Sequence, residues 1–234
     1  MSQPEILIIL TSHAAMGDTG EPTGYWLEEL LAPYYAFVDA GANVTISSIK
    51  GGLPPVDPSS LTNDLFDRYE DDALLHVKLK NSHAVTDVNA ADYDAIFLPG
   101  GHGTMWDLPD NQALATLLTT AWADNKIVAA VCHGVAGILN AKAQDGAPLA
   151  KGRKLTAFSN DEESMVGLAD KVPFLLEDKL KAQGAVYESA SPLQPKALRD
   201  GNLITGQNPV SSAPTAKLVL KALSERGQKQ AATG

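Results

Sequence analysis

The 234-residue sequence has a single cysteine and no long apolar run. One cysteine excludes an intramolecular disulfide and a zinc site built on several thiolates. No run approaches the roughly 18 apolar residues that a membrane-spanning helix needs. The first residues contain neither a basic region nor a long apolar region, so they are not typical of a secretory signal peptide. We therefore expect a reducing, cytoplasmic location.

Positively charged residues are also scarce. The sequence has 18 Lys and Arg residues against 28 Asp and Glu residues, which gives a formal net charge of -10. Such a surface repels phosphate backbones and anionic lipid headgroups, so we expect neither a nucleic-acid polymer nor a membrane as partner. The other proportions, 44% hydrophobic and 20% charged residues, are typical of a folded globular protein rather than a disordered or fibrous one. The length favours one domain over residues 1–234.

Short apolar runs recur along the chain and alternate with stretches of helical periodicity. Continuous apolar runs are typical of strands that are covered on both faces. The alternation predicts an α/β fold with a mostly parallel sheet and an active site beyond the carboxyl ends of the strands. The predicted strands are 6–10, 43–47, 95–98, 127–131, 154–158 and 203–205, and the predicted helices are 25–40, 111–125 and 213–223.

Two segments depart from this alternation. Residues 51–91 are rich in Pro, Asp, Asn and Ser and show little periodicity. We expect them to form an insertion or a cap over the site, although a plain surface excursion is an equal alternative. Residues 225–234 form a polar C-terminal tail that we expect to be frayed.

Cys132 stands at the end of a predicted strand, in the string Ala-Val-Cys-His-Gly-Val-Ala-Gly. This pattern of a nucleophile with a glycine two residues later is typical of a strand-turn-helix elbow, which lifts the side chain out of the sheet. The N–H groups of a following helix would favour the thiolate. The alternative is a buried structural cysteine.

Two further groups near Cys132 are candidates for the site. The backbone N–H of His133 follows the candidate nucleophile and is suited to hold an oxyanion, and its ring can act as an acid or a base. A histidine whose ring is satisfied by a carbonyl is the alternative. The glycine-rich loop 99–103 follows another predicted strand and could supply a second oxyanion N–H, although it could also be a simple tight turn.

Carboxylates occur in two places that could reach the site. Glu28 and Glu29 lie on the first predicted helix and point about 100° apart, so one can face the sheet edge while the other faces solvent. Surface positions for both are the alternative. Asp161, Glu162 and Glu163 follow a predicted strand, where they can orient a histidine or cap a helix, and capping is favoured for Asp161.

Several strings together resemble the ThiJ/PfpI superfamily, and most closely its heat-shock chaperone and glyoxalase III branch. They are DAIFLPGGHGTMWDLPDN and VAAVCHGVAGIL, joined by PTGYWLEELLAPYYAF, LTAFSNDEE and LITGQNPVSS. The resemblance extends from Ile6 to Leu223. It implies a flavodoxin-like three-layer sandwich with a mostly parallel central sheet and a small insertion, and a homodimer.

The resemblance also implies roles for five residues. Cys132 matches the nucleophile at the elbow, and His133 matches its neighbour. Glu29 matches a helix glutamate that hydrogen-bonds the cysteine. Glu163 matches the acid that completes a Cys-His-acid triad, with the two preceding acidic residues as alternatives. Gly101 matches a glycine that binds the oxyanion.

Other chemistries are less favoured. Related glutamine amidotransferases use a late His-x-Glu pair, whereas this sequence has no histidine after His133 and instead has Gly206–Val210 in that region. We expect no metal and no cofactor, because no metal-ligand spacing is apparent at His13, His76 or His83.

The resemblance implies a glutathione-independent glyoxalase of the glyoxalase III type, which converts methylglyoxal or glyoxal into lactate or glycolate through a cysteine hemithioacetal. The same chemistry on glycated amines would be a deglycase activity. A holding chaperone with a redox-sensing cysteine and a small peptidase or amidase are the alternatives.

Overall fold

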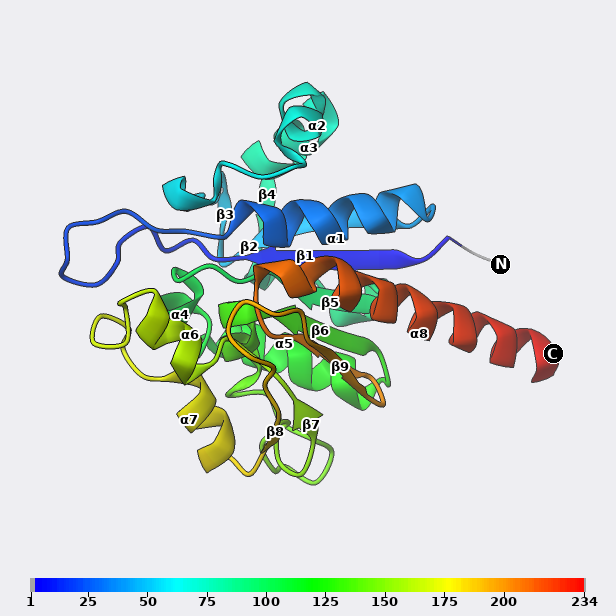
Figure 1. Ribbon diagram of the computed structural model, residues 1–234. Helices are drawn as coiled ribbons and strands as arrows, with labels where there is room; N and C mark the ends of the chain where they lie inside the picture. The colour runs from blue at the N-terminus through cyan, green and yellow to red at the C-terminus, as the bar shows by residue number, and fades with distance from the viewer. Residues whose placement is uncertain (1–2, 234) are drawn as a thin grey trace.

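The computed structural model of the protein describes residues 3–233, and it has one large sheet with helices on both faces (Figure 1). The sheet has eight strands in the order β3-β4-β2-β1-β5-β6-β10-β9. The six inner strands are parallel, and the edge strands β3 and β9 are antiparallel to their neighbours. The strands are β1 Glu5–Leu10, β2 Asn43–Ser48, β3 Lys50–Gly52, β4 Ser82–Ala84, β5 Ala95–Leu98, β6 Ile127–Val131, β9 Ala197–Asp200 and β10 Leu203–Gly206.

The helices divide between two hydrophobic cores, one on each face of the sheet. The first core contains residues of α1, α3 and α8, and the second contains residues of α4, α5 and α7. The prediction of a three-layer α/β sandwich with a mostly parallel sheet is thereby confirmed. The helices are α1 Leu27–Asp39, α2 Phe66–Asp71, α3 Ala73–Lys80, α4 Thr104–Asp107, α5 Gln112–Ala123, α6 Asn160–Met165, α7 Leu176–Ala182 and α8 Ser212–Thr233.

Strand β1 shows why the apolar runs form strands. Ile6 and Ile8 belong to the core that contains α1 and α8, whereas Leu7 and Ile9 belong to the core on the opposite face. All four side chains are fully buried. Because successive side chains of a strand point to opposite faces, a strand covered on both faces needs apolar residues at every position.

The predicted strand at 154–158 is wrong in extent and in partner. Only Lys154–Leu155 is a strand, β7, and it pairs with β8 (Val186–Tyr187) in a separate two-stranded sheet. The N–H of Thr156 donates instead to the side-chain oxygen of Thr205, at 2.9 Å. The ladder therefore stops there, and the buried residues that follow lead as a loop into α6.

The segment 51–91 supplies an inner strand as well as helices. Strand β4 pairs with β2, and the two-helix unit α2–α3 lies beside α1, away from α5 (Figure 1). Residues near 55–60 hold the chain that enters α1, since the N–H of Tyr25 donates to the Pro55 carbonyl and the N–H of Leu27 donates to Ser60 Oγ. The segment therefore extends the sheet and positions the start of α1.

The tail that we expected to be frayed from residue 225 continues helix α8 to Thr233. Its composition of Ala, Gln, Lys, Glu and Arg favours a helix. The Arg199 guanidinium also contacts the Glu225 carboxylate at 2.8 Å and ties this part of α8 to β9. Among residues 3–233, no helix combines the length and hydropathy required to cross a membrane.

Candidate active site

Cys132 lies where β6 ends and a 3-10 helix, Cys132–Ile138, begins. Its φ of 57° is left-handed, which is uncommon for a residue other than glycine and is maintained only where packing enforces it. Gly134 allows this turn, because a Cβ there would lie 2.3 Å from the Leu98 carbonyl oxygen and 2.6 Å from that of Pro99. The turn has the geometry of an elbow that raises the thiol above the sheet.

The thiol of Cys132 is held in an environment that favours its protonated form. Only 3% of the residue is exposed, and burial raises the pKa of the thiol, with a further increase from the neighbouring Glu29. The backbone N–H of His133 acts in the opposite direction but is outweighed. The prediction that the N–H groups of the following helix stabilise a thiolate is therefore wrong. A nucleophilic role requires a base.

His133 is placed to be that base. Its Nδ1 lies 3.4 Å from Cys132 Sγ, and its Nε2 lies 2.6 Å from Glu163 Oε2. A carboxylate only accepts hydrogen bonds, so Nε2 carries the proton and Nδ1 presents its lone pair toward the sulfur. Burial, followed by the nearby His102, lowers the pKa of His133. The ring is therefore neutral at pH 7 and able to take a proton.

Glu163 is shared by two imidazole rings. Its second oxygen, Oε1, accepts a hydrogen bond from His102 Nε2 at 2.8 Å, and the two ring centroids are 4.1 Å apart. Burial alone would raise the pKa of Glu163, but the two imidazoles lower it to about 2. The carboxylate therefore stays ionised and fixes the orientation of His133.

The structure separates the three acidic residues that the sequence left as alternatives. Ser159 is the N-cap of α6, and it forms a capping box with Glu162. Asp161 is exposed in the first helical turn and does not cap, so the capping role favoured for it is wrong. Of the three, Glu163 is the residue that meets His133.

Glu162 links α6 to two neighbouring loops. The carboxylate is fully buried and accepts hydrogen bonds from the Leu193 N–H, from Gln207 Nε2 and from Asn208 Nδ2, at 2.9, 3.0 and 2.7 Å. Gln207 and Asn208 lie in the region where a glutamine amidotransferase would carry its His-x-Glu pair. Here they anchor the helix that carries Glu163.

Glu29 projects from the first turn of α1 and is fully buried, whereas Glu28 is half-buried. Its Oε2 accepts the Gly100 N–H at 2.7 Å, and its Oε1 makes no hydrogen bond of ordinary geometry with a described residue. Burial raises the pKa of Glu29 to about 8, although Cys132 and the Gly100 N–H oppose the rise. At pH 7 this carboxyl therefore holds a proton beside the thiol.

Gly101 follows β5 and His133 follows the end of β6, so their backbone N–H groups lie at the same edge of the sheet. The N–H of Gly101 donates no backbone hydrogen bond among the described residues, whereas the N–H of His133 interacts with the sulfur of Cys132. Gly101 has φ of 100°, and a Cβ there would lie 2.4 Å from the Gly24 carbonyl oxygen. Only glycine fits this position without a shift of the backbone.

His102 was not among the predicted site residues. It is the one side chain with chemical function in the glycine-rich loop 99–103, which was the available signal. With His133 and Glu163 it forms a set whose ligand atoms all lie within 4.8 Å of one another, and two imidazoles with a carboxylate are a zinc-type donor set. The Nε2 atom of each ring already hydrogen-bonds a different oxygen of Glu163, so these three ligand groups bind one another.

A sequence model described as the DJ-1/PfpI family matches residues 23–222. The chain belongs to the DJ-1/PfpI family. Glyoxalase 3 of Candida albicans is 33% identical over 232 residues, which cover 93% of this chain and 98% of that protein. The identification made from the motifs is thereby confirmed.

Two solved structures share the fold of this chain closely. The 24 kDa rapid encystment protein of Francisella tularensis has a TM-score of 0.91 and 43% identity, and the match covers 94% of this chain and 99% of that one. Glyoxalase III of Candida albicans has a TM-score of 0.86 and 30% identity, with coverages of 94% and 97%.

The buried hydrogen bonds of Glu162 predict a loss of stability on Glu162→Gln. The amide nitrogen of a glutamine would face donors that now reach a carboxylate, so we expect a loss of about 1–3 kcal/mol in the free energy of unfolding. Denaturant titration measures this loss. Asp161→Asn is the matched control, and we expect it to change stability by less than about 0.5 kcal/mol because Asp161 is exposed. Equal effects of the two changes would contradict the role given to Glu162.

The environment of the thiol predicts how Cys132 reacts with iodoacetamide. Because burial and Glu29 raise the thiol pKa, the alkylation rate of the wild type should increase with pH only above the range of a free cysteine, about 8.5. In Glu29→Gln the carboxylate is removed, and the midpoint should move to lower pH. A wild-type midpoint below that of free cysteine would show that the backbone N–H groups prevail.

Proposed function

We propose that this protein is a glutathione-independent glyoxalase of the glyoxalase III type, which converts methylglyoxal and water into lactate. One observation carries the proposal: a buried thiol, a neutral imidazole, a protonated carboxyl and the backbone N–H groups of Gly101 and His133 lie together at the carboxyl ends of β5 and β6. The resemblance to proteins named glyoxalase 3 and glyoxalase III, each at about 30% identity, supports the same reaction.

In the first step, Sγ of Cys132 bonds to the aldehyde carbon of the substrate. His133 Nδ1, 3.4 Å from the sulfur, accepts the thiol proton, and the Glu163 carboxylate stabilises the imidazolium that forms. The N–H groups of Gly101 and His133 hold the developing oxyanion. The imidazolium then returns its proton to this oxygen and leaves a neutral hemithioacetal.

The second step moves hydrogen from the aldehyde carbon to the neighbouring carbon. The protonated Glu29 donates to the ketone oxygen while neutral His133 removes the proton on the carbon that bears sulfur, which gives an enediol. Return of a proton to the former ketone carbon, and loss of the enediol O–H proton to Glu29, gives a thioester of lactate. The change is an internal isomerisation, so it needs no external oxidant or reductant.

Hydrolysis completes the cycle. Neutral His133 accepts a proton from water as the water attacks the thioester carbonyl, and the oxyanion again faces the two N–H groups. Collapse of this intermediate breaks the carbon–sulfur bond, returns the proton to the sulfur of Cys132 and releases lactate. The same sequence with glyoxal would give glycolate.

The small exposure of the thiol favours small free aldehydes. Cys132 is 3% exposed and His133 is 1% exposed, and the Phe158 ring packs at a tilt against His133 with centroids 4.4 Å apart. A glycated side chain on another protein would have to enter the same enclosed space. Deglycase activity is therefore the less favoured extension of this chemistry.

The alternatives receive less support from the same observations. A redox sensor needs an accessible, low-pKa thiolate, whereas Cys132 is buried and its pKa is raised. A peptidase or amidase would use the same triad but would have to admit a peptide to the enclosed thiol. The cytoplasmic location and the homodimer remain predictions; the reaction requires a compartment that keeps Cys132 reduced.

Lactate formation from methylglyoxal, without glutathione or added metal, tests the proposal directly. We expect the wild type to form lactate and Cys132→Ala to form none. Glu29→Gln should reduce kcat by at least about 100-fold, because an amide cannot exchange a proton in the catalytic cycle. Glu28→Gln is the matched control, since its half-buried side chain lies next along the helix, and it should keep nearly wild-type activity. The absence of lactate from a folded, reduced wild type would contradict the proposal.

The two shifted pKa values predict the dependence of kcat/KM on pH. His133 must be neutral, and its pKa is lowered, so the rate should rise with pH below about 6.5. Glu29 must be protonated, and its pKa is raised, so the rate should fall as the pH passes about 8. Measurements from about pH 5 to about pH 10 show both limbs. A rate that keeps rising above pH 9 would identify ionisation of the thiol, about 8.5 when unperturbed, as the controlling step.

A further inference from the structure

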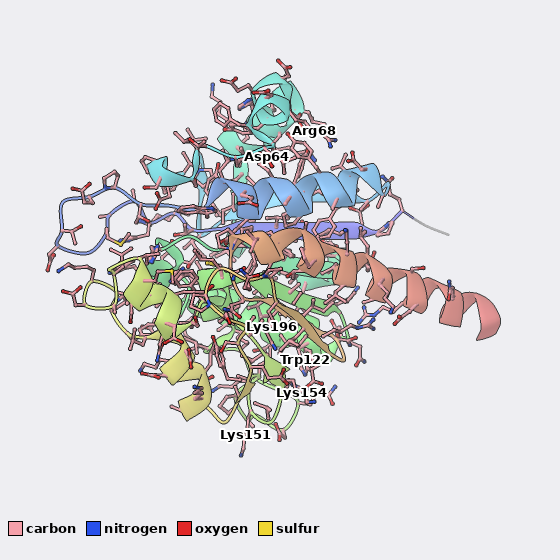
Figure 2. All side chains as sticks on the ribbon, viewed as in Figure 1. Asp64, Arg68, Trp122, Lys151, Lys154 and Lys196 are labelled. Carbon is pink, nitrogen blue, oxygen red and sulfur yellow. The ribbon has the colours of Figure 1, made fainter. Side chains whose placement is uncertain are left out.

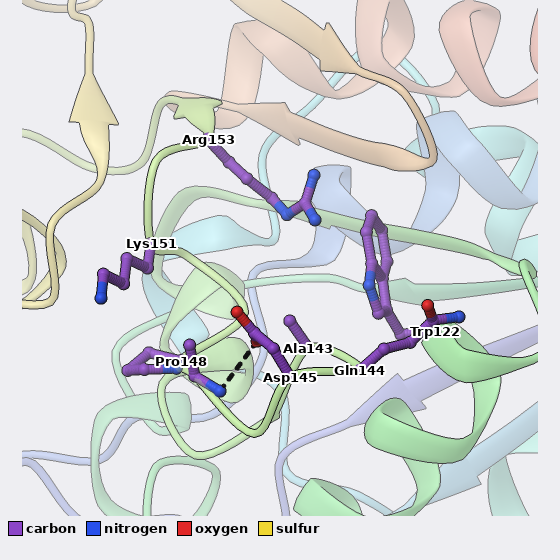
Figure 3. Close-up of a pocket in the computed structure, with 8 residues that line it drawn as sticks. Trp122, Ala143, Gln144, Asp145, Pro148, Lys151 and Arg153 are labelled. Carbon is purple, nitrogen blue, oxygen red and sulfur yellow. Dashed lines mark hydrogen bonds between the residues drawn. The ribbon is translucent and has the colours of Figure 1, made fainter.

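A second concave region lies outside the candidate active site, at the end of α5. It is a pocket of about 320 Å³, and the residues that line it include Trp122, Asp145, Pro148, Lys151 and Arg153 (Figure 3). Trp122 lies just before β6 begins, whereas Cys132 lies where β6 ends. A strand of this length spans roughly 17 Å, so the pocket is separate from the candidate active site. Its labelled residues Trp122 and Lys151 lie away from α2, where Arg68 is labelled (Figure 2).

Arg153 is the central polar group of this pocket. Its guanidinium carbon lies 4.3 Å from the centre of the Trp122 ring, and the two side chains lie side by side (Figure 3). Its Nε is buried and has no hydrogen-bond partner among the described residues. No salt bridge joins the guanidinium to a described carboxylate.

The stacked arrangement leaves the guanidinium ready for an anion. Stacking uses the face of the group, while its N–H donors point outward in the plane. A planar fork of donors matches a carboxylate or a phosphate, which accepts two parallel hydrogen bonds. Contact with Trp122 therefore fixes the orientation of Arg153 and leaves its N–H donors available to a bound anion.

The charges around the pocket point the same way. Lys151 and Arg153 are its cations and Asp145 is its carboxylate, so the lining carries a net positive charge in a protein whose net charge is -10. The Oδ1 of Asp145 already accepts the Ala147 N–H at 3.0 Å. The net positive charge of the lining is therefore available to attract an anionic ligand.

We propose that this pocket binds a small molecule through a carboxylate or phosphate group held by Arg153. The anion takes two in-plane N–H donors, Lys151 at the rim adds attraction, and the body of the ligand rests against Trp122 and Pro148. The volume of about 320 Å³ is at the lower end of ordinary small-molecule sites, which limits the ligand to a compact metabolite. The site neither uses nor requires the chemistry of Cys132.

Calorimetric titration with inorganic phosphate and with succinate tests this proposal, with the indole N–H resonance of Trp122 followed in parallel by NMR. We expect at least one anion to bind with a Kd in the range of about 1 mM or below and to shift that resonance. Tighter binding of phosphate would assign the site to phosphate esters, and tighter binding of succinate would assign it to carboxylates.

Two variants of Arg153 distinguish binding by its planar set of N–H donors from a general effect of positive charge. Arg153→Gln should weaken binding at least about tenfold, and Arg153→Lys should also weaken it, because lysine lacks the planar fork. Lys154→Gln is the matched control, since it removes one exposed positive charge from the next position and should change Kd by less than about twofold. Thermal unfolding checks that each variant is folded, and Trp122→Leu, which removes the stacking surface but keeps the charge, replaces Arg153→Gln if that variant is not.

Two results would overturn the proposal. One is the absence of binding of both anions to the wild type at about 20 mM, well above the expected Kd. The other is an equal loss of affinity in Arg153→Gln and Lys154→Gln, which would indicate a diffuse effect of charge rather than a built site.

Discussion

The candidate active site depends on the hydrogen bond between His133 Nε2 and Glu163 Oε2, which are 2.6 Å apart. The carboxylate can only accept, so this bond places the imidazole proton on Nε2 and turns the free lone pair of Nδ1 toward Cys132. Together with His133, the second imidazole, that of His102, keeps Glu163 ionised despite its burial. Without this arrangement the buried thiol would have no base beside it. The hydrogen bonds from two loops to the Glu162 carboxylate hold α6 in the position that the His133–Glu163 bond requires.

Different neighbours drive the two buried carboxyls of the site apart in pKa. The carboxyl of Glu29 has few donors and its pKa is raised to about 8, whereas that of Glu163 has two imidazole donors and its pKa is lowered to about 2. The same chemical group therefore serves as an acid in one place and as a permanent anion in another. The imidazole of His133 remains neutral between them, which supplies a base at neutral pH. Enclosure also raises the pKa of the Cys132 thiol, so in the reaction that we propose the attack of the sulfur is coupled to proton transfer.

The parallel sheet brings these groups together. Strands β5 and β6 are neighbours, and their carboxyl ends deliver the Gly100–Gly101 turn and Cys132 to the same edge. Close packing there tolerates no side chain at several positions; a Cβ at Gly100 would lie 2.6 Å from Glu29 Oε2 and 2.8 Å from the His133 nitrogen. The opposite end of the sheet leaves room for the Trp122–Arg153 pocket, where an unsatisfied guanidinium is retained at the surface. Two chemically different sites are thus separated by the length of one strand.

The sequence by itself determined the α/β class, most inner strands and the elbow cysteine, because apolar runs and the Cys-His-Gly pattern are local signals. It also narrowed the acid to three consecutive residues. Only the tertiary structure decided that Glu163 meets His133, since one position along α6 rotates a side chain by about 100°. Strand β4 was missed because its three residues, Ser-His-Ala, form no apolar run, and His102 was missed because only the fold brings it to Glu163, 61 residues away. The sequence also could not predict the direction in which the thiol pKa shifts. The local N–H groups that the motif suggests would lower this pKa, but burial and the neighbouring Glu29 raise it by more.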